Sequence, residues 1–423
     1  METNRIRSER YRWILLGILF VTYFLEQGSR QIYNAALPQI KLDFAALGVT
    51  DTQLGLVGTV FSAVFGLSLV GSGLASDFFG RKRVLVLGTL LFSLGVFVSG
   101  FAAGIGLLMV AYGVFNAVGQ CCVAPPCYSL IAQHHGRTRS VAMAVFQAAV
   151  YLGVILSSVF AGCLSESGAG GWRLAFWIAG GVGILWAFVM QCGVDDGDAG
   201  QPEQAERPSL KAAFNALLGK PTAMLIAAAF GMFIYANLGI RLWTPMFMVR
   251  HFEGVGVAKA ALHAVVWLNA GAILSSLVAA RVIDRLAPRW PRVRLDASAV
   301  GFVLCAAPVV LVARSTTFAG CCAALFALGL TVGVYEAAHY PAMFDCVPAR
   351  YRSATTGLTG CYAFVFGSFA PAVLGWMGGT FSMRTAFASL GAFYLLGAAI
   401  LVPAIVRYFK ADYIPQVQGR ELQ

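Results

Sequence analysis

Long stretches without a charged side chain limit what this chain can fold into. Two of them run from Val84 to Met109 and from Val141 to Cys163. A helix that crosses a bilayer needs roughly 20 mostly apolar residues, and both stretches are long enough. Only 12% of the residues are charged and 59% are hydrophobic, whereas a soluble domain carries about 25% charged residues. The chain is therefore predicted to be an all-α integral membrane protein.

The apolar runs predict about twelve transmembrane helices, with ends uncertain by a few residues. No cleavable signal peptide is expected, because the first run is too long for the core of one and lacks a small-residue exit. The predicted helices are 13–38, 54–76, 84–103, 107–133, 141–163, 172–192, 222–249, 259–282, 297–314, 318–345, 355–378 and 384–407.

The net charge of +11 reflects membrane topology, and no nucleic-acid partner is expected. If the N-terminus is placed in the cytoplasm, 22 of the 30 Lys and Arg residues fall in cytoplasmic segments. This bias follows the positive-inside rule and predicts that both termini are cytoplasmic.

The chain divides near its middle. Residues 193–221 include the polar stretch from Asp195 to Lys220 and have the composition of a flexible linker. We therefore predict an N-terminal six-helix bundle at 1–192, a cytoplasmic linker at 193–221, and a C-terminal bundle with a short cytoplasmic tail at 222–423. Pro38 and Pro245 are 207 residues apart, as are Asp77 and Asp284, which predicts that the two bundles are related by pseudo-symmetry.

No enzyme site is expected. The ten Cys lie mostly in apolar segments and show neither zinc-site nor CxxC spacing. No nucleophile–base pair, metal cluster or nucleotide-binding loop is recognisable, so no cofactor or metal is predicted.

The loop after the second predicted helix carries a motif that resembles a known family. It reads Gly73-Leu-Ala-Ser-Asp77-Phe-Phe-Gly80-Arg81-Lys82-Arg83. This resembles the G-x-x-x-D-x-x-G-R-K/R-K/R motif of the major facilitator superfamily, and the resemblance covers essentially the whole chain. It implies a conformational latch, with glycines for close packing and turning and with charges that hold one conformation. The corresponding loop in the second half of the chain keeps the charged residues Asp284 and Arg285 but not the glycines of the motif. The proposed latch residues are therefore Gly73, Asp77, Gly80, Arg81, Lys82, Arg83, Asp284 and Arg285.

Within that family the first helix is most similar to the organic-anion branches. Ser29-Arg30, followed by Leu37-Pro38, resembles the anion:cation symporters and spinster-type carriers, with Ser29 in place of their usual Asp. Arg30 lies eight residues before Pro38, as in the organophosphate:phosphate antiporters. Two features depart from the related carriers: Asn237 stands where the antiporters have a second Arg, and the fourth-helix Arg of many proton-coupled members is absent.

A charge inside the membrane costs at least ~2.5–3.5 kcal/mol and needs a reason. Arg30 suits a carboxylate or phosphate through its planar guanidinium, or it forms a structural pair with Glu26 one turn earlier. By the 207-residue offset, Arg30 matches Asn237 and Asn34 matches Arg241. These four residues could close on one anion from opposite halves, or Arg241 could instead serve as a structural or gating residue.

Other polar residues complete the candidate site. Glu26, Glu336 and His339 are candidate proton-coupling groups, because a carboxylate in a low-dielectric cavity gains proton affinity and His titrates near neutral pH. The alternative for Glu336 and His339 is a satisfied hydrogen bond between helices. Further candidates for substrate contact, on helices that line the cavity in this family, are Gln120, Gln147, Tyr151, Asn269 and Tyr362.

The resemblance implies a secondary active transporter that works by alternating access. We expect its substrate to be a small organic anion, a carboxylate or phosphate ester, coupled to a proton or exchanged for another anion. The alternatives are a drug or neutral-solute exporter of the same fold, and a membrane sensor of a sugar phosphate that does not transport. We expect a monomer in the lipid bilayer, in a bacterial inner membrane.

Overall fold

The computed structural model describes residues 2–135, 139–168, 170–194, 214–215, 217–348 and 351–414. Within these ranges, the side chains of residues 2–9, 73–74, 76–78, 132, 139–141, 144 and 353–354 are not described. The described backbone is helical and contains no strand. Eleven helices of this part are long and apolar enough to cross a membrane. The one expected span that is not among these eleven is the first, α1 (Glu2–Asp43), whose apolar run is interrupted by Glu26, Gln27 and Arg30.

The helices bend or break where the sequence disfavours a continuous α-helix. The fourth span is divided into α4 (Ile105–Leu108), a π-helical stretch (η2, Met109–Asn116), α5 (Ala117–Cys121) and α6 (Ala124–His134). Pro125 and Pro126 lie in the first turn of α6 and account for the break between α5 and α6. The predicted helix 355–378 is likewise divided, into α14 (Arg352–Gly367) and α15 (Phe369–Thr380). The last predicted helix corresponds to α16 (Met383–Pro403), which is followed by a second π-helical stretch (η4, Ala404–Tyr408) and by α17 (Phe409–Asp412).

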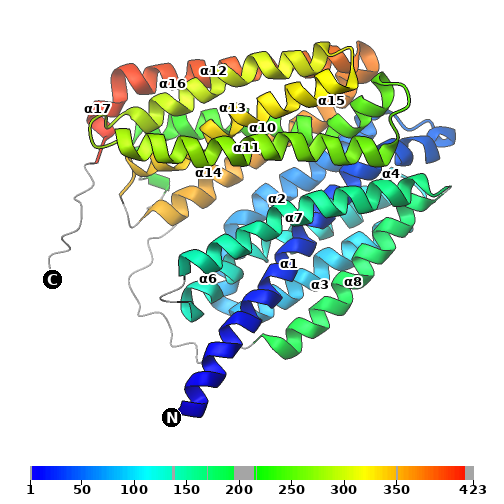
Figure 1. The fold of residues 1–423 in the computed structure, drawn as a ribbon, viewed down its shortest axis with the longest axis horizontal. Helices are drawn as coiled ribbons and strands as arrows, with labels where there is room; N and C mark the ends of the chain where they lie inside the picture. Colours follow the sequence, from blue (N-terminus) through cyan, green and yellow to red (C-terminus); the bar gives the residue numbers. More distant parts are fainter. Residues whose placement is uncertain are drawn as a thin grey trace. The chain divides into compact units, whose positions relative to one another are not determined.

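The chain forms two compact units, and the bounds of these units fall inside some of the helices. Figure 1 shows the helices coloured along the sequence. The first unit comprises residues 1–203, 239–266 and 368–380. Its helices are α1 (Glu2–Asp43), α2 (Asp51–Phe79), α3 (Arg81–Ser99), α4 (Ile105–Leu108), η2 (Met109–Asn116), α5 (Ala117–Cys121), α6 (Ala124–His134), α7 (Arg139–Glu166) and α8 (Gly171–Gly193), with the end of α10, the start of α11 and α15 (Phe369–Thr380).

The second unit comprises residues 204–238, 267–367 and 381–423. In it, α12 packs against both α13 and α16. Its helices are the first part of α10 (Pro221–His251), most of α11 (Val257–Leu286), α12 (Val293–Arg314), α13 (Phe318–Phe344), α14 (Arg352–Gly367), α16 (Met383–Pro403) and α17 (Phe409–Asp412). Most of the predicted linker lies outside the described residues, and the division at 193–221 stays a prediction.

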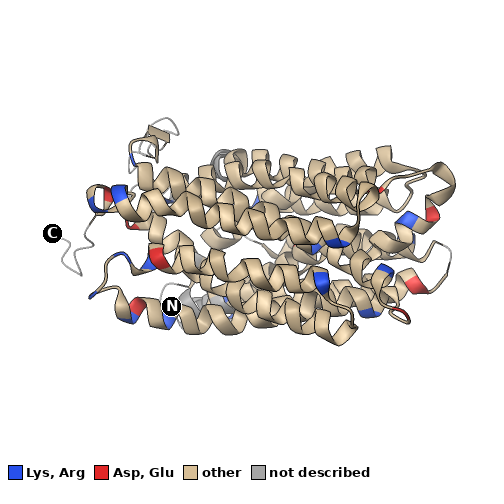
Figure 2. Cartoon of the chain, turned by 90° about the horizontal axis from the view of Figure 1, so that it is seen from above, with Lys and Arg blue, Asp and Glu red and all other residues tan. Residues whose placement is uncertain are grey.

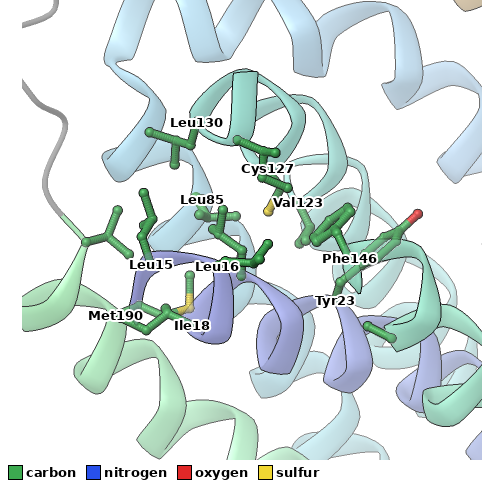
Figure 3. Close-up of a cluster of buried hydrophobic side chains, with 14 of the residues drawn as sticks. Leu15, Leu16, Ile18, Tyr23, Leu85, Val123, Cys127, Leu130, Phe146 and Met190 are labelled. Atoms are coloured by element: carbon green, nitrogen blue, oxygen red, sulfur yellow. The ribbon is translucent and has the colours of Figure 1, made fainter. Parts of the chain in front are cut away.

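The positions of Lys, Arg, Asp and Glu lie mostly toward the ends of the helices, and other residues make up most of the spans between them (Figure 2). A core in the first unit joins α1, α3, α6, α7 and α8 (Figure 3). There the rings of Tyr23 and Phe146 stack with centroids 4.3 Å apart. Close packing of α1 and α7 depends on Gly153, where a Cβ would lie 2.5 Å from the Phe24 carbonyl oxygen. This packing holds in place the part of α1 that carries Glu26 and Arg30, the charged residues within the span.

Candidate functional site

Arg30 lies on α1 within a polar cluster of the first unit. Its Nε and Nη2 donate to Oε1 of Gln120 over 3.1 and 2.8 Å, and Nη2 also donates to Oε1 of Glu26 over 3.2 Å. The Arg30 side chain keeps 23% of its surface exposed. The ion pair with Glu26 that the helical spacing predicts is therefore present, and Gln120 binds the same guanidinium from another helix.

Gln120 is itself fixed by two further hydrogen bonds. Its Nε2 donates to Oγ of Ser29 and to Oδ1 of Asn116, both over 2.9 Å. The amide oxygen accepts both hydrogen bonds from Arg30, and the amide nitrogen donates both of these further bonds. All four bonds therefore fit a single orientation of the amide, in which the oxygen faces Arg30. The buried Gln120 thus presents a fixed acceptor to Arg30.

A π-helical stretch and close glycine packing position Gln120. The stretch Met109–Asn116 precedes α5, and such stretches occur often at functional sites. Next to Gln120, Gly119 has no room for a side chain, since a Cβ would lie 2.3 Å from the backbone nitrogen of Phe92 and 2.6 Å from the Gly88 oxygen. The crossing of α3 and α5 therefore sets how far Gln120 reaches toward α1.

Glu26 is 2% exposed, and its Oε2 has no hydrogen-bond partner in the part of the chain that the structure describes. A buried carboxylate oxygen without a partner carries a desolvation cost that its contact with Arg30 offsets only in part. Protonation of Glu26 would remove that cost and would also release Arg30 from the ion pair.

Aromatic rings cover the guanidinium of Arg30. Its Cζ lies 4.6 Å from the centroid of Phe65 and 5.5 Å from that of Phe61, within range of a cation–π interaction. The Tyr112 hydroxyl donates to the Arg30 backbone oxygen over 2.9 Å, and the Tyr112 ring packs against Phe61. The sequence reasoning missed both phenylalanines, because nothing in the pattern of α2 distinguishes them from other apolar residues.

The remaining candidates of the first unit are not among the hydrogen-bond partners of the Arg30 side chain. Asn34 donates to the side chain of Gln31 over 3.2 Å. Gln147 is exposed on α7 and accepts from the Tyr128 hydroxyl over 3.2 Å, and Tyr151 is exposed on the same helix. Arg241 is half-buried on the part of α10 that belongs to this unit. None of these side chains hydrogen-bonds to Arg30.

In the second unit, Asn237 and Asn269 are buried and Tyr362 is exposed. The proton-coupling candidate Glu336 has an exposed side chain on α13. Tyr335 and His339, four residues apart, occupy the interior face of α13 and leave Glu336 on another face.

His339 lies in an aromatic cluster and is 6% exposed. Its ring stacks on Tyr335 with centroids 4.9 Å apart and planes 8° apart, and it also packs against Phe230 and Tyr340. Neither ring nitrogen has a hydrogen-bond partner among the described residues. The alternative of a satisfied hydrogen bond therefore does not account for His339.

The latch residues are described in part. Gly80 has a φ of 88°, in the region that favours glycine, and it joins α2 directly to α3. Arg81 donates from Nη1 to Oε1 of Gln133 on α6 over 2.6 Å. Gly73 and Asp77 lie outside the residues whose surroundings are described. Lys82 is half-buried and Arg83 is exposed.

In the second half, Asp284 is 72% exposed and lies 3.5 Å from Arg294, while Arg285 is exposed. The shorter ion pair joins Arg294 to the buried Asp345 over 2.7 Å. The sequence reasoning missed Arg294 and Asp345, although an Asp directly after a long apolar helix is a signal that could have drawn attention to it. No group of three or more metal-ligating side chains occurs within the described ranges.

The family model described as Major Facilitator Superfamily matches residues 19–309. An "MFS-type efflux pump" of Mycolicibacterium smegmatis is 25% identical over 409 residues, which is 95% of this chain and 93% of the relative. A "Cis,cis-muconate transport protein" of Acinetobacter baylyi is 23% identical over 430 residues and covers 98% of each chain. These relatives span nearly the full length of the chain.

Among solved structures, a bacterial homolog of the human lysosomal transporter Spinster, crystallised in an inward-facing and unoccupied conformation, has a TM-score of 0.84. It is 19% identical, and the match covers 96% of this chain and 99% of that one. At this identity the likeness shows the fold alone.

Proposed function

The chain belongs to the Major Facilitator Superfamily, and on that premise we propose that it carries a small organic anion across the membrane by alternating access. It is an integral, multi-pass membrane transporter and not an enzyme. The substrate we propose is a carboxylate or phosphate ester. Both termini are proposed to be cytoplasmic, as the distribution of Lys and Arg predicts. Bacterial relatives are consistent with an inner-membrane location.

One observation carries the proposal: an arginine inside the span keeps hydrogen-bond donors that the protein does not use. Arg30 has five N–H donors. Three of them are taken by Gln120 and Glu26. The two on Nη1 make no hydrogen bond to any residue that the structure describes, and the side chain is partly exposed. A half-buried cation with open donors inside a membrane span is suited to an anionic ligand.

The relative named for cis,cis-muconate supports an anionic substrate. The relative named as an efflux pump supports the second candidate, an exporter of drugs or neutral solutes. For that candidate Arg30 would be purely structural. A sensor that does not transport has no observation in its favour.

For coupling, we propose a proton or a counter-anion, with Glu26 as the first proton-binding candidate. Its support is the contact with Arg30 and the buried oxygen without a partner. An incoming anion would compete for Arg30, and Glu26 would then bind a proton more readily. Glu336 and His339 remain weaker candidates, because the first is exposed and the second makes no contact with Arg30.

The other substrate contacts also stay proposals. They are Asn34, Asn237, Arg241, Gln147, Tyr151, Asn269 and Tyr362.

The test is thermal unfolding of the purified protein with a panel that contains muconate, a phosphate ester, a neutral sugar and a lipophilic drug. A ligand at about 100 times its dissociation constant stabilises a protein by about 2.7 kcal/mol. We expect an anion to raise the unfolding temperature of the wild type and to have no effect on Arg30→Gln.

The matched control is Arg292→Gln. Arg292 forms the same kind of pair, with Asp296 four residues on and 3.0 Å away, outside the Arg30 cluster. This variant should keep the shift. If Arg30→Gln keeps the shift, or if only neutral or lipophilic compounds stabilise the protein, the organic-anion proposal is wrong.

A further inference from the structure

The connection between α11 and α12 carries open positive charge. From residue 281 to residue 294 the sequence has five Arg and one Asp, a net charge of +4. Arg292 and Arg294 pair with Asp296 and Asp345 over 3.0 and 2.7 Å, so the protein itself uses these two guanidiniums. The other three arginines are exposed and form no ion pair within the part of the chain that the structure describes. They are Arg281, Arg285 and Arg289.

These three arginines share one side of the helix end. They are four residues apart, and the amides of Ala287 and Trp290 donate to carbonyl oxygens four residues earlier, so the helical turn continues past the end of α11. The opposite side of this turn is buried, where Ile283 packs with Val293 and Ala338 in an apolar cluster. At 1.5 Å rise per residue, the arginines therefore form a row about 12 Å long that faces away from that cluster.

The same side of α11 is apolar and exposed within the span. Leu274, Leu277 and Val278 are all exposed. Leu274 lies seven residues before Arg281 and Val278 lies seven residues before Arg285, and residues seven apart are nearly in line along an α-helix. Because exposed large apolar side chains of a membrane span face the acyl chains, the row of arginines lies where this face leaves the hydrocarbon and reaches the headgroups.

Trp290 adds an exposed indole next to the row. It lies between Pro288 and Pro291, which restrict the backbone of the turn. Its ring has no stacking or hydrogen-bonding partner among the described residues. Trp is enriched at the interface between membrane and water, because its ring is apolar and its N–H donates a hydrogen bond. The turn therefore presents both cationic and interfacial side chains.

We propose that this row of arginines, together with Trp290, binds the phosphate of an anionic phospholipid in the leaflet at this end of the span. A guanidinium binds phosphate oxygens through its planar fork, and clusters of Lys and Arg next to a span attract anionic headgroups. The acyl chains of this lipid would lie along the apolar side of α11 that contains Leu274. In this conformation the proposal assigns Arg285 to the headgroup and not to the latch.

Membrane topology alone does not account for these features. Positive charge next to a span indicates which side is cytoplasmic, but it requires neither alignment with the lipid-facing side of the helix nor an exposed indole. The lipid site lies in the second unit, whereas the Arg30 cluster belongs to the first. The inference therefore goes beyond the proposed function and does not depend on the substrate.

The test is thermal unfolding of the purified full-length protein in a neutral detergent, titrated with dioleoyl-phosphatidylglycerol, dioleoyl-phosphatidylcholine or inorganic phosphate. The two lipids have the same acyl chains, so only their headgroups distinguish them. A ligand of the folded state raises the unfolding temperature as its concentration rises, which gives an apparent affinity. We expect phosphatidylglycerol to bind more tightly than phosphatidylcholine, and we expect added salt to weaken this preference.

Paired variants assign the preference to the row. Arg285→Gln with Arg289→Gln should weaken the apparent affinity for phosphatidylglycerol roughly tenfold or more. Arg285→Lys with Arg289→Lys should keep most of it, because the charges remain. The matched control is Arg314→Gln, which removes an exposed arginine at the other end of α12 and should behave as the wild type. If the Gln pair unfolds without lipid, Arg289→Gln alone, beyond the end of α11, carries the test.

Three results would overturn the inference. They are equal stabilisation of the wild type by the two lipids, an unchanged affinity for phosphatidylglycerol in the Gln variants, and an equal loss in Arg314→Gln. Stabilisation by inorganic phosphate that disappears with Arg285→Gln and Arg289→Gln would also overturn it, because the row would then be a site for a soluble anion. Phosphate binding that depends on Arg30 belongs to the first unit and leaves the lipid preference as the deciding result.

Discussion

At the scale of single residues, the site is an arginine whose N–H donors are only partly used by the residues that the structure describes. Gln120 and Glu26 take three donors and Nη1 keeps two. Because hydrogen bonds that involve a charged group contribute about 1.5–3 kcal/mol, the partner at each position strongly affects how Arg30 meets an anion. Two substitutions test this division.

Gln120→Glu replaces the neutral acceptor with a carboxylate at the same edge. The cluster of Arg30, Glu26 and the new Glu then has a net negative charge, so affinity for anions should fall at least about tenfold, or 1.4 kcal/mol. Calorimetry with muconate measures this. The control is Gln133→Glu, since Gln133 also accepts from an arginine, Arg81, but lies outside the cluster. Unchanged affinity in Gln120→Glu would contradict the assigned geometry.

Glu26→Gln removes the charge that competes with the substrate for Arg30. Anion binding should become tighter, and exchange of anions across a vesicle membrane should continue. Accumulation driven by an imposed pH gradient should be lost, because the proton-binding group is gone. Gradient-driven accumulation in Glu26→Gln that equals the wild type would rule out Glu26 as the coupling residue.

At this scale the sequence predicts contacts within one helix better than contacts between helices. The pair of Glu26 and Arg30 follows from a spacing of four residues. The contact of Arg30 with Gln120 joins residues 90 positions apart and depends on how α1 crosses α5. No local pattern distinguishes Phe61 or Phe65 from the other members of a set of 31 Phe.

At the scale of helices, the spans are predictable and their irregularities are not. Hydropathy locates most spans within a few residues, as in α13, predicted at 318–345 and observed at Phe318–Phe344. The first span is the exception, since it is predicted at 13–38 and α1 runs from Glu2 to Asp43. The π-helical stretch Met109–Asn116 is just as apolar as a regular helix would be, so hydropathy cannot distinguish the two. That stretch comes shortly before Gln120, whose side-chain oxygen accepts hydrogen bonds from Arg30.

Gly119→Ala tests whether the crossing of α3 and α5 positions the site. The new methyl group would lie 2.3 Å from the backbone nitrogen of Phe92, which cannot move aside as a side chain can. Overpacking of this kind costs about 1–3 kcal/mol, and the shift of α5 should also weaken anion binding. Unfolding temperature and muconate affinity report the two effects. Gly106→Ala is the control, because nothing lies within 4 Å of its added atom, and equal behaviour of the two variants would refute the role of the crossing.

At the scale of the whole molecule, the first unit gathers segments from both halves of the sequence. The end of α10 joins α2 through Asp51, which accepts from Nη1 and Nη2 of Arg250 over 2.6 and 2.9 Å and lies 3.3 Å from Lys41. Nearby, Trp243 donates to the backbone oxygen of Pro371 at α15 over 2.9 Å. The sequence pattern predicts six helices in each half, but it contains no signal for this grouping, which depends on contacts between distant segments.

Asp51→Asn should destabilise the first unit, because it leaves Arg250 and Lys41 without their carboxylate. Asp51 is 7% exposed, but both cations remain partly in solvent, so we expect a loss of about 1–3 kcal/mol and not the full cost of a broken buried pair. A double-mutant cycle with Arg250→Gln, followed by thermal unfolding, measures the coupling. Asp296→Asn, in a more exposed pair, should cost less, and a smaller loss in Asp51→Asn than in Asp296→Asn would contradict this account.

The most direct test of the central claim is exchange of labelled muconate into proteoliposomes loaded with unlabelled muconate, a phosphate ester or a neutral sugar. The account predicts that the wild type exchanges the carboxylate, that Arg30→Gln does not, and that Arg292→Gln does so as well as the wild type. Exchange that persists in Arg30→Gln, or transport that is confined to neutral or lipophilic compounds, would contradict the claim that this protein carries an organic anion through a site centred on Arg30.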